Sequence, residues 1–218
     1  DAAIVGAGAI SPLVTLVCDG APGVQRSAAR ALANLACSPE SHVAIVGAGA
    51  ISPLVTIVRD GAPDAQRSAA GALANIVRSP ESQAAMVSAG AVAPLVALVR
   101  DGVPRARWSA AEALANLAIS PEFNAAIVGS GAISPLVALV RDGVPDAQSS
   151  AAEALAMLAR SQKSHAAMVG AGAISPLVAL VRDGVPGVQG SAARALANLA
   201  CSPEFDAAIV GAGAISPL

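Results

Sequence analysis

The sequence predicts an all-α solenoid, a stack of helical units in which each unit packs only on its neighbours. Three observations indicate this fold class. The phrase Gly-Ala-Gly-Ala-Ile-Ser-Pro-Leu-Val at 6–14 returns with few changes every 41 residues, and such a fixed period is typical of stacked supersecondary units. Helix start and stop signals recur at fixed places within each period. Apolar residues make up 55% of the chain and aromatic residues only 1%, so the core has to consist of Ala, Val, Leu and Ile.

The period divides the chain into five units and a remnant, which together form a single array. The remnant has the same sequence as residues 1–13. Natural arrays end in polar capping units, and neither end of this sequence carries one. We therefore expect head-to-tail self-association, in competition with packing of the remnant on the fifth unit. The units are 1–41, 42–82, 83–123, 124–164 and 165–205, and the remnant is 206–218.

Each unit is predicted to contain a short, a middle and a long helix. In the second unit, Ser38-Pro39-Glu40 offers an N-cap serine, a proline at the first helical position and an acid in the first turn. The short helix should therefore span about 39–46 and end at Gly47 and Gly49.

The next start signal is Ser52-Pro53, which predicts a middle helix over 54–60 that ends at Gly61. Pro63 then opens the long helix, expected over about 64–78. Apolar residues at helical spacing mark its buried face. They are Ala65, Ala69, Ala72, Leu73 and Ile76.

The repeated phrases resemble the armadillo-repeat family. They are Gly-Ala-Ile-x-x-Leu-Val-x-Leu-Val in the middle helix and Ala-Ala-x-Ala-Leu-x-Asn-Leu-Ala in the long helix. HEAT repeats have a similar length but two helices, and they lack the Ala-Leu-x-Asn phrase. The resemblance, which extends to the repeat domains of importin-α and β-catenin-like proteins, implies a right-handed superhelix of about five three-helix repeats. The family often has proline directly after Gly-Ala-Ile, where this chain has Ser-Pro, so we expect the middle helix to begin one residue later.

One position of the long helix carries asparagine in most units, with Met157 in the fourth. Asparagine is only a fair helix former, so its recurrence requires an explanation. In armadillo proteins this asparagine lines the concave face and bonds the backbone of an extended peptide, and the resemblance implies the same role here. The alternative is an asparagine that bonds within its own repeat, or that was simply duplicated with it. The residues are Asn34, Asn75, Asn116 and Asn198.

The residues one and two helical turns before each asparagine vary between units, while the rest of the unit hardly changes. One turn before, where importin-α-like proteins carry tryptophan, stand Arg30, Gly71, Glu112, Glu153 and Arg194. Two turns before stand Arg26, Arg67, Trp108, Ser149 and Gly190. Variation on one face fits recognition, although neutral drift gives the same pattern. With the asparagines, the candidate peptide-binding residues are Arg26, Arg30, Arg67, Trp108, Glu112, Glu153 and Arg194.

Other functions lack support in the sequence. A dinucleotide site is disfavoured because Ser52-Pro53 stands where a phosphate-binding helix should expose backbone N–H groups, and because the phrase recurs in every unit. His42 and His165 occupy one repeat position in different units, and no catalytic set or metal-spaced cluster is present, so we expect no enzyme activity, metal or cofactor. A net charge of −2 gives no general attraction to nucleic acid or anionic lipid.

The composition also bears on the compartment and on the membrane. The chain has three cysteines, an odd number that suits a reducing, intracellular setting. No run of apolar residues is long enough to span a bilayer. Two functions remain open. The first is a protein- or peptide-binding scaffold that uses the concave face, and the second is a structural spacer or self-assembling array, natural or engineered, with no dedicated ligand.

Overall fold

The computed structural model describes residues 8–201, and throughout this range every regular element is helical. The remnant 206–218 and the expected contact of its sequence with the fifth unit lie outside the described residues. The contacts group the chain into two compact units, with unit 1 ending at Leu117 and unit 2 beginning at Ala118. Each is described by itself.

The helices repeat in the order short, middle and long. Unit 1 contains the middle helix α2 (Ile10–Asp19) and the long helix α3 (Pro22–Leu35), followed by two complete repeats. These are α4 (Glu40–Gly47), α5 (Ile51–Asp60), α6 (Pro63–Ile76), α7 (Pro80–Ser88), α8 (Val92–Asp101) and α9 (Pro104–Leu117). Unit 2 contains η1 (Pro121–Phe123), α10 (Asn124–Gly129), α11 (Ile133–Asp142), α12 (Pro145–Leu158), α13 (Gln162–Gly170), α14 (Ile174–Asp183) and α15 (Pro186–Ala200).

The middle helix begins earlier than the sequence analysis predicted. Helix α5 starts at Ile51 rather than at 54, and Ser52 is not its N-cap. The Ser52 carbonyl instead accepts a bond from Thr56 Oγ1 four residues on, as expected inside a helix. Proline fits here because the first N–H groups of a helix have no partner within it. The cap-and-proline signal is correct for α7, where Ser79 Oγ accepts from the N–H of Ser82 and Pro80 is the first helical residue.

The glycine phrase forms the sharp turn between the short and middle helices. Gly49 has φ +74°, a conformation that favours glycine. The N–H of Gly49 donates to the Val46 carbonyl and the N–H of Ala50 to the Ile45 carbonyl, which caps the end of α4. The same positive φ recurs at the equivalent glycine of each later described repeat. The phrase is therefore a helix-to-helix turn.

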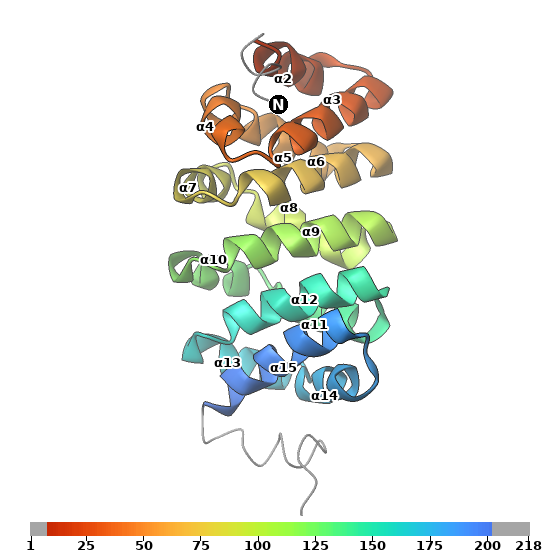
Figure 1. Ribbon diagram of the computed structural model, residues 1–218, viewed down its shortest axis with the longest axis vertical. Helices are drawn as coiled ribbons and strands as arrows, with labels where there is room; N and C mark the ends of the chain where they lie inside the picture. The colour runs from red at the N-terminus through yellow and green to blue at the C-terminus, as the bar shows by residue number, and fades with distance from the viewer. Residues whose placement is uncertain (1–7, 202–218) are drawn as a thin grey trace, which may run out of the picture. The chain divides into compact units, whose positions relative to one another are not determined.

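The long helices pack side by side and carry much of the core. Figure 1 shows α3, α6 and α9 adjacent in unit 1, and α12 contacts α15 in unit 2. The predicted buried face of α6 is confirmed, and Leu73, Leu114 and Leu155 are all buried. Alanine lines most of these helix contacts and lets the helices approach closely, while the leucines supply most of the apolar burial.

A glutamine holds the long helix to the middle helix of its own repeat. Gln66 Nε2 donates to the Val58 carbonyl at 3.1 Å, near the end of α5. The same bond occurs from Gln25, Gln148 and Gln189, and Arg107 takes its place on α9. Because the last carbonyls of a helix lack partners within it, each of these side chains satisfies one of them and fixes the angle between the two helices.

Within the described range, no single helix is long and apolar enough to cross a membrane. Four pairs of consecutive helices satisfy the length and composition only when taken together, and each pair is bent by 78–87°.

Candidate functional site

Three of the four repeated asparagines bond the long helix of the preceding repeat through their side chains. In unit 1, Asn75 Nδ2 donates to the Ala33 carbonyl at 3.0 Å and Asn116 Nδ2 donates to the Ala74 carbonyl at 2.9 Å. In unit 2, Asn198 Nδ2 donates to the Ala156 carbonyl at 2.8 Å. The bond joins two repeats, so the sequence-based alternative of a bond within one repeat is wrong.

Each of these amides keeps part of its bonding capacity free. An asparagine side chain has two N–H donors and a carbonyl oxygen. The side-chain oxygens (Oδ1) of Asn75, Asn116 and Asn198 accept no hydrogen bond from residues 8–201, and the three side chains are only half-buried. The inter-repeat bond therefore fixes the orientation of an amide that still presents an acceptor.

Two positions of the row differ from the others. Asn34 lies on α3, the first long helix of the described range; it is exposed and its side chain makes no hydrogen bond there. Met157 replaces the amide on α12 and is half-buried. Asn34 therefore offers an amide without the inter-repeat bond, which makes it a matched control for Asn75.

We call the solvent-facing side of α3, α6 and α9 in unit 1 the asparagine face. Residues four apart on a helix share one side, so each asparagine lies in line with the variable residues one and two turns before it. The asparagine face consists of Arg26, Arg30, Asn34, Arg67, Gly71, Asn75, Trp108, Glu112 and Asn116. It gathers the predicted site residues of unit 1, and Figure 1 shows the three helices that carry them.

The remaining predicted residues, Glu153 and Arg194, belong to unit 2 and bind each other. Arg194 on α15 donates to Glu153 Oε1 on α12 at 3.1 Å, and both side chains are partly exposed. In unit 1 a comparable pair joins Arg26 on α3 to Asp64 on α6 at 3.4 Å. Exposed pairs of this kind contribute little to stability, but they neutralise the charges involved.

Glu112 is the acidic residue of the asparagine face, and its side chain is half-buried. Burial raises the pKa of its carboxyl, and the charge of Arg78 partly offsets that effect. Desolvation disfavours the ionised form of an acid, so the ionised Glu112 would be stabilised by a closer cation. Sequence analysis did not identify Arg78, which lies just beyond the end of α6, one helical turn after the asparagine row.

Trp108 lies two turns before Asn116 on α9 and is 37% exposed. Its ring offers apolar area beside the polar groups of the asparagine face. It is the only tryptophan, and the chain has no tyrosine, so its fluorescence reports on this face alone.

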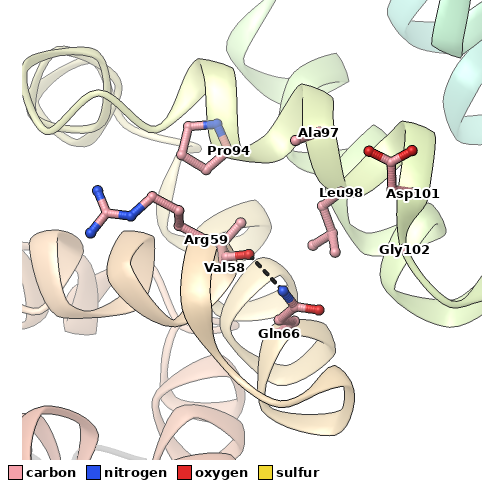
Figure 2. Close-up of a pocket in the computed structure, with 8 residues that line it drawn as sticks. All are labelled: Val58, Arg59, Gln66, Pro94, Ala97, Leu98, Asp101 and Gly102. Atoms are coloured by element: carbon pink, nitrogen blue, oxygen red, sulfur yellow. Dashed lines mark hydrogen bonds between the residues drawn. The ribbon is translucent and has the colours of Figure 1, made fainter.

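Two cavities of unit 1 lie on the side of the middle helices. One cavity, of about 230 Å³, lies between α5 and α8. Figure 2 shows its lining residues and the Gln66–Val58 bond that forms part of its wall. A cavity of about 350 Å³ occupies the equivalent place between α2 and α5, lined among others by Gln25, Val17 and Pro53. Because the same hollow recurs at successive repeat junctions, we attribute it to the packing of the repeats rather than to a specific ligand.

The two histidines have a structural role. His42 Nε2 lies 2.8 Å from the Ala36 carbonyl and His165 Nε2 lies 2.6 Å from the Ala159 carbonyl, and both rings are buried. Each side chain thus satisfies a carbonyl at the end of the preceding long helix. Asn124 occupies the same repeat position, and its buried Oδ1 has no hydrogen-bond partner among the described residues.

Comparison with known proteins identifies the repeat. The sequence matches the family described as Armadillo/beta-catenin-like repeat over residues 2–37, 38–78 and 165–201. No curated protein gave a match. Solved structures do match. One engineered protein is 33% identical, with 94% of this chain and 87% of that chain covered and a TM-score of 0.90.

Two further similar structures are designed armadillo repeat proteins. A computationally designed armadillo repeat protein for modular peptide recognition is 31% identical, with 94% of this chain and 89% of that chain covered and a TM-score of 0.87. A designed armadillo repeat protein in complex with the peptide (KR)4 is also 31% identical, with 94% and 88% covered and a TM-score of 0.86. These similarities confirm the predicted fold class.

Proposed function

The chain belongs to the armadillo-repeat family, and we propose that it is a non-catalytic scaffold that binds an extended peptide or protein segment along the asparagine face. The observation that carries this proposal is the geometry of the asparagines. In unit 1, the side-chain amides of Asn75 and Asn116 are each held by a bond to the neighbouring long helix, at 3.0 and 2.9 Å, and their Oδ1 atoms accept no hydrogen bond from the described residues.

Such a row suits the backbone of an extended chain. An extended peptide exposes N–H and C=O groups at regular intervals, and a side-chain amide can pair with both kinds of group. Pre-oriented amides lose little conformational entropy when they bind, so less of the interaction energy is spent on ordering them. The designed relatives described for modular peptide recognition and in complex with (KR)4 support the same use of the fold.

The alternative function is a spacer or self-assembling array without a dedicated ligand. The near-identity of the units is compatible with it, because identical repeats present the same surface at each junction. The two functions differ in one observable, a saturable peptide complex formed by a monomeric chain.

A selection from a displayed library of random ten-residue peptides tests the proposal. We expect the chain to enrich peptides that bind saturably. Asn34→Ala should lower the affinity for the selected peptides and leave the unfolding free energy almost unchanged. Ser27→Ala, an exposed substitution on the same helix whose hydroxyl bonds only the Gly23 carbonyl, is the control. A library that yields no binder, together with light scattering that grows with protein concentration, would contradict the proposal and favour the self-assembling array.

We also propose an intracellular setting without nucleic-acid or membrane partners. The three cysteines are free and exposed, which favours a reducing compartment. The net charge of −2 gives no general attraction to phosphate backbones or anionic headgroups.

A further inference from the structure

The long helices of the two units differ in how their charges are balanced. In unit 2, Glu153 and Arg194 neutralise each other at 3.1 Å. In unit 1, α3 and α6 together carry Arg26, Arg30 and Arg67, but only one carboxylate, Asp64, which pairs with Arg26. Among the described residues, Arg30 and Arg67 have no ion pair or hydrogen bond. The asparagine face therefore presents two uncompensated guanidinium groups.

These two arginines are placed to act together. Arg30 lies one turn before Asn34 on α3, and Arg67 lies two turns before Asn75 on the adjacent helix α6. Arg30 is exposed and Arg67 is half-buried. A guanidinium group binds a carboxylate through two parallel hydrogen bonds, so a carboxylate near the α3–α6 boundary suits this pair.

The opposite charge lies on α9. Glu112 is half-buried and has no salt bridge within residues 8–201. Burial penalises its charge, and Arg78 relieves that penalty only in part. An incoming cation would give the Glu112 carboxylate the close partner that it lacks.

Gly71 lies on α6, between the helix that carries Arg30 and the helix that carries Glu112, and Trp108 lies on α9, one turn before Glu112. A Cβ added at Gly71 would meet only Ser109 Oγ at 3.8 Å, an ordinary contact, so packing does not require glycine there. The missing side chain leaves open space between Arg30 and Glu112, and the exposed ring of Trp108 provides an apolar surface beside it.

We propose that the asparagine face recognises an extended peptide with an acidic residue against Arg30 and Arg67, an apolar residue against Trp108, and a basic residue against Glu112. This rests on the proposed function. Packed helices are about 8–10 Å apart, so the α3–α6 boundary lies roughly 12–15 Å from α9. An extended chain rises about 3.3 Å per residue, which places acid and base about four residues apart. An even spacing puts both side chains, and the apolar one between them, on the same side of the peptide.

Synthetic nine-residue peptides and Trp108 fluorescence test the inference. The peptides carry glutamate, leucine and arginine at alternate positions in a serine host, in both chain directions, and contain no aromatic residue. A matched peptide has glutamine in place of both charged residues. We expect the charged peptide, in one direction, to bind at least about tenfold more tightly than the neutral one, with a saturable change in Trp108 emission.

Charge reversal provides the control. Arg30→Glu with Arg67→Glu should abolish the preference, and a peptide with arginine in place of its glutamate should regain binding to that variant. Arg59→Glu with Arg100→Glu changes the net charge equally at exposed arginines of the middle helices, each paired with the next aspartate, and should leave the preference intact.

The outcomes separate the two proposals. Equal binding of the charged and neutral peptides overturns the charge pattern but leaves the peptide-binding function standing. Loss of the preference in the Arg59→Glu, Arg100→Glu control also overturns it, because the effect would then depend on net charge alone. If neither these peptides nor any library peptide binds, both proposals are overturned.

Discussion

The side-chain amide of Asn75 donates a hydrogen bond to the backbone carbonyl of Ala33, which lies 42 residues earlier on the long helix of the preceding repeat. The bond is 3.0 Å long and partly buried. The residue expected to contact a ligand therefore also holds two repeats together. The same nitrogen also donates to Cys37 Sγ at 3.5 Å. The two roles share one amide, since these bonds use only its N–H groups and leave Oδ1 as an acceptor for a ligand.

This double role predicts that alanine substitution changes the stability differently at Asn75 and at Asn34. Asn75→Ala should lower the unfolding free energy by about 1 kcal/mol more than Asn34→Ala, because only Asn75 loses an intramolecular bond. Both variants gain equally from the better helix propensity of alanine, so their difference in stability reports the bonds of Asn75 to the Ala33 carbonyl and to Cys37 Sγ. Urea denaturation measures it, and equal stability of the two variants would show that these bonds contribute nothing.

The sequence was sufficient to predict the class, the repeat and the core, but not the middle-helix start. Strict recurrence of Pro53 and its equivalents identified the period, and the helical spacing of Leu73 and Ile76 identified the buried face. The start of α5 at Ile51 was missed because proline is compatible with several positions in a first turn. Its local signal does not distinguish them.

The sequence was sufficient to predict which residues of the candidate site share a side of a helix, but not which residues they contact. The shared side of Arg30 and Asn34 follows from their spacing of four residues. In contrast, the Glu153–Arg194 pair and the influence of Arg78 on Glu112 depend on how neighbouring repeats pack. No local pattern encodes that packing. The bond of Asn75 was missed for the same reason, because its acceptor belongs to another repeat.

The raised pKa of Glu112 predicts a dependence of stability on pH. Because the folded state binds this proton more tightly than the unfolded state, the associated stability is fully present below the ordinary glutamate pKa of about 4.3 and is lost as pH rises through the folded pKa. The unfolding free energy of wild type minus that of Glu112→Gln should therefore be largest at about pH 4 and lower at neutral pH. Urea melts of both proteins across this range measure the difference, in which the other groups cancel. A difference that rises with pH would mean that Arg78, rather than burial, dominates.

The orphaned oxygen of Asn124 predicts a stabilising substitution. Histidine occupies the same repeat position at 42 and 165, where its Nε2 contacts the carbonyl six residues earlier. Asn124→His should place the same contact on Ala118 and remove a buried acceptor without a partner, raising the unfolding free energy by about 0.5–1.5 kcal/mol. Asn124→Ala serves as the control for loss of the whole side-chain amide. A thermal melt in which Asn124→His is less stable than wild type would exclude the shared capping geometry.

Gly71 predicts a conflict between stability and binding. Alanine at this helical position should raise the unfolding free energy by as much as about 1 kcal/mol, since glycine is a poor helix former and the new Cβ meets only an ordinary contact. Gly190→Ala on α15 should add a similar amount, because nothing lies within 4 Å of its Cβ. Only Gly71→Ala should also lower the affinity of the asparagine face for peptides. Equal peptide affinity of wild type and Gly71→Ala would show that the space beside Glu112 is not used.

The most direct test of peptide recognition by the asparagine face follows the side-chain amides by NMR while a library-selected peptide is added. We expect the amide signals of Asn34, Asn75 and Asn116 to shift saturably and together, because they line one face of unit 1. The amides of Gln25 and Gln66, which bond carbonyls of the middle helices, should stay in place. Shifts confined to the glutamines, or unmoved asparagine signals at saturating peptide, would contradict recognition by the asparagine face.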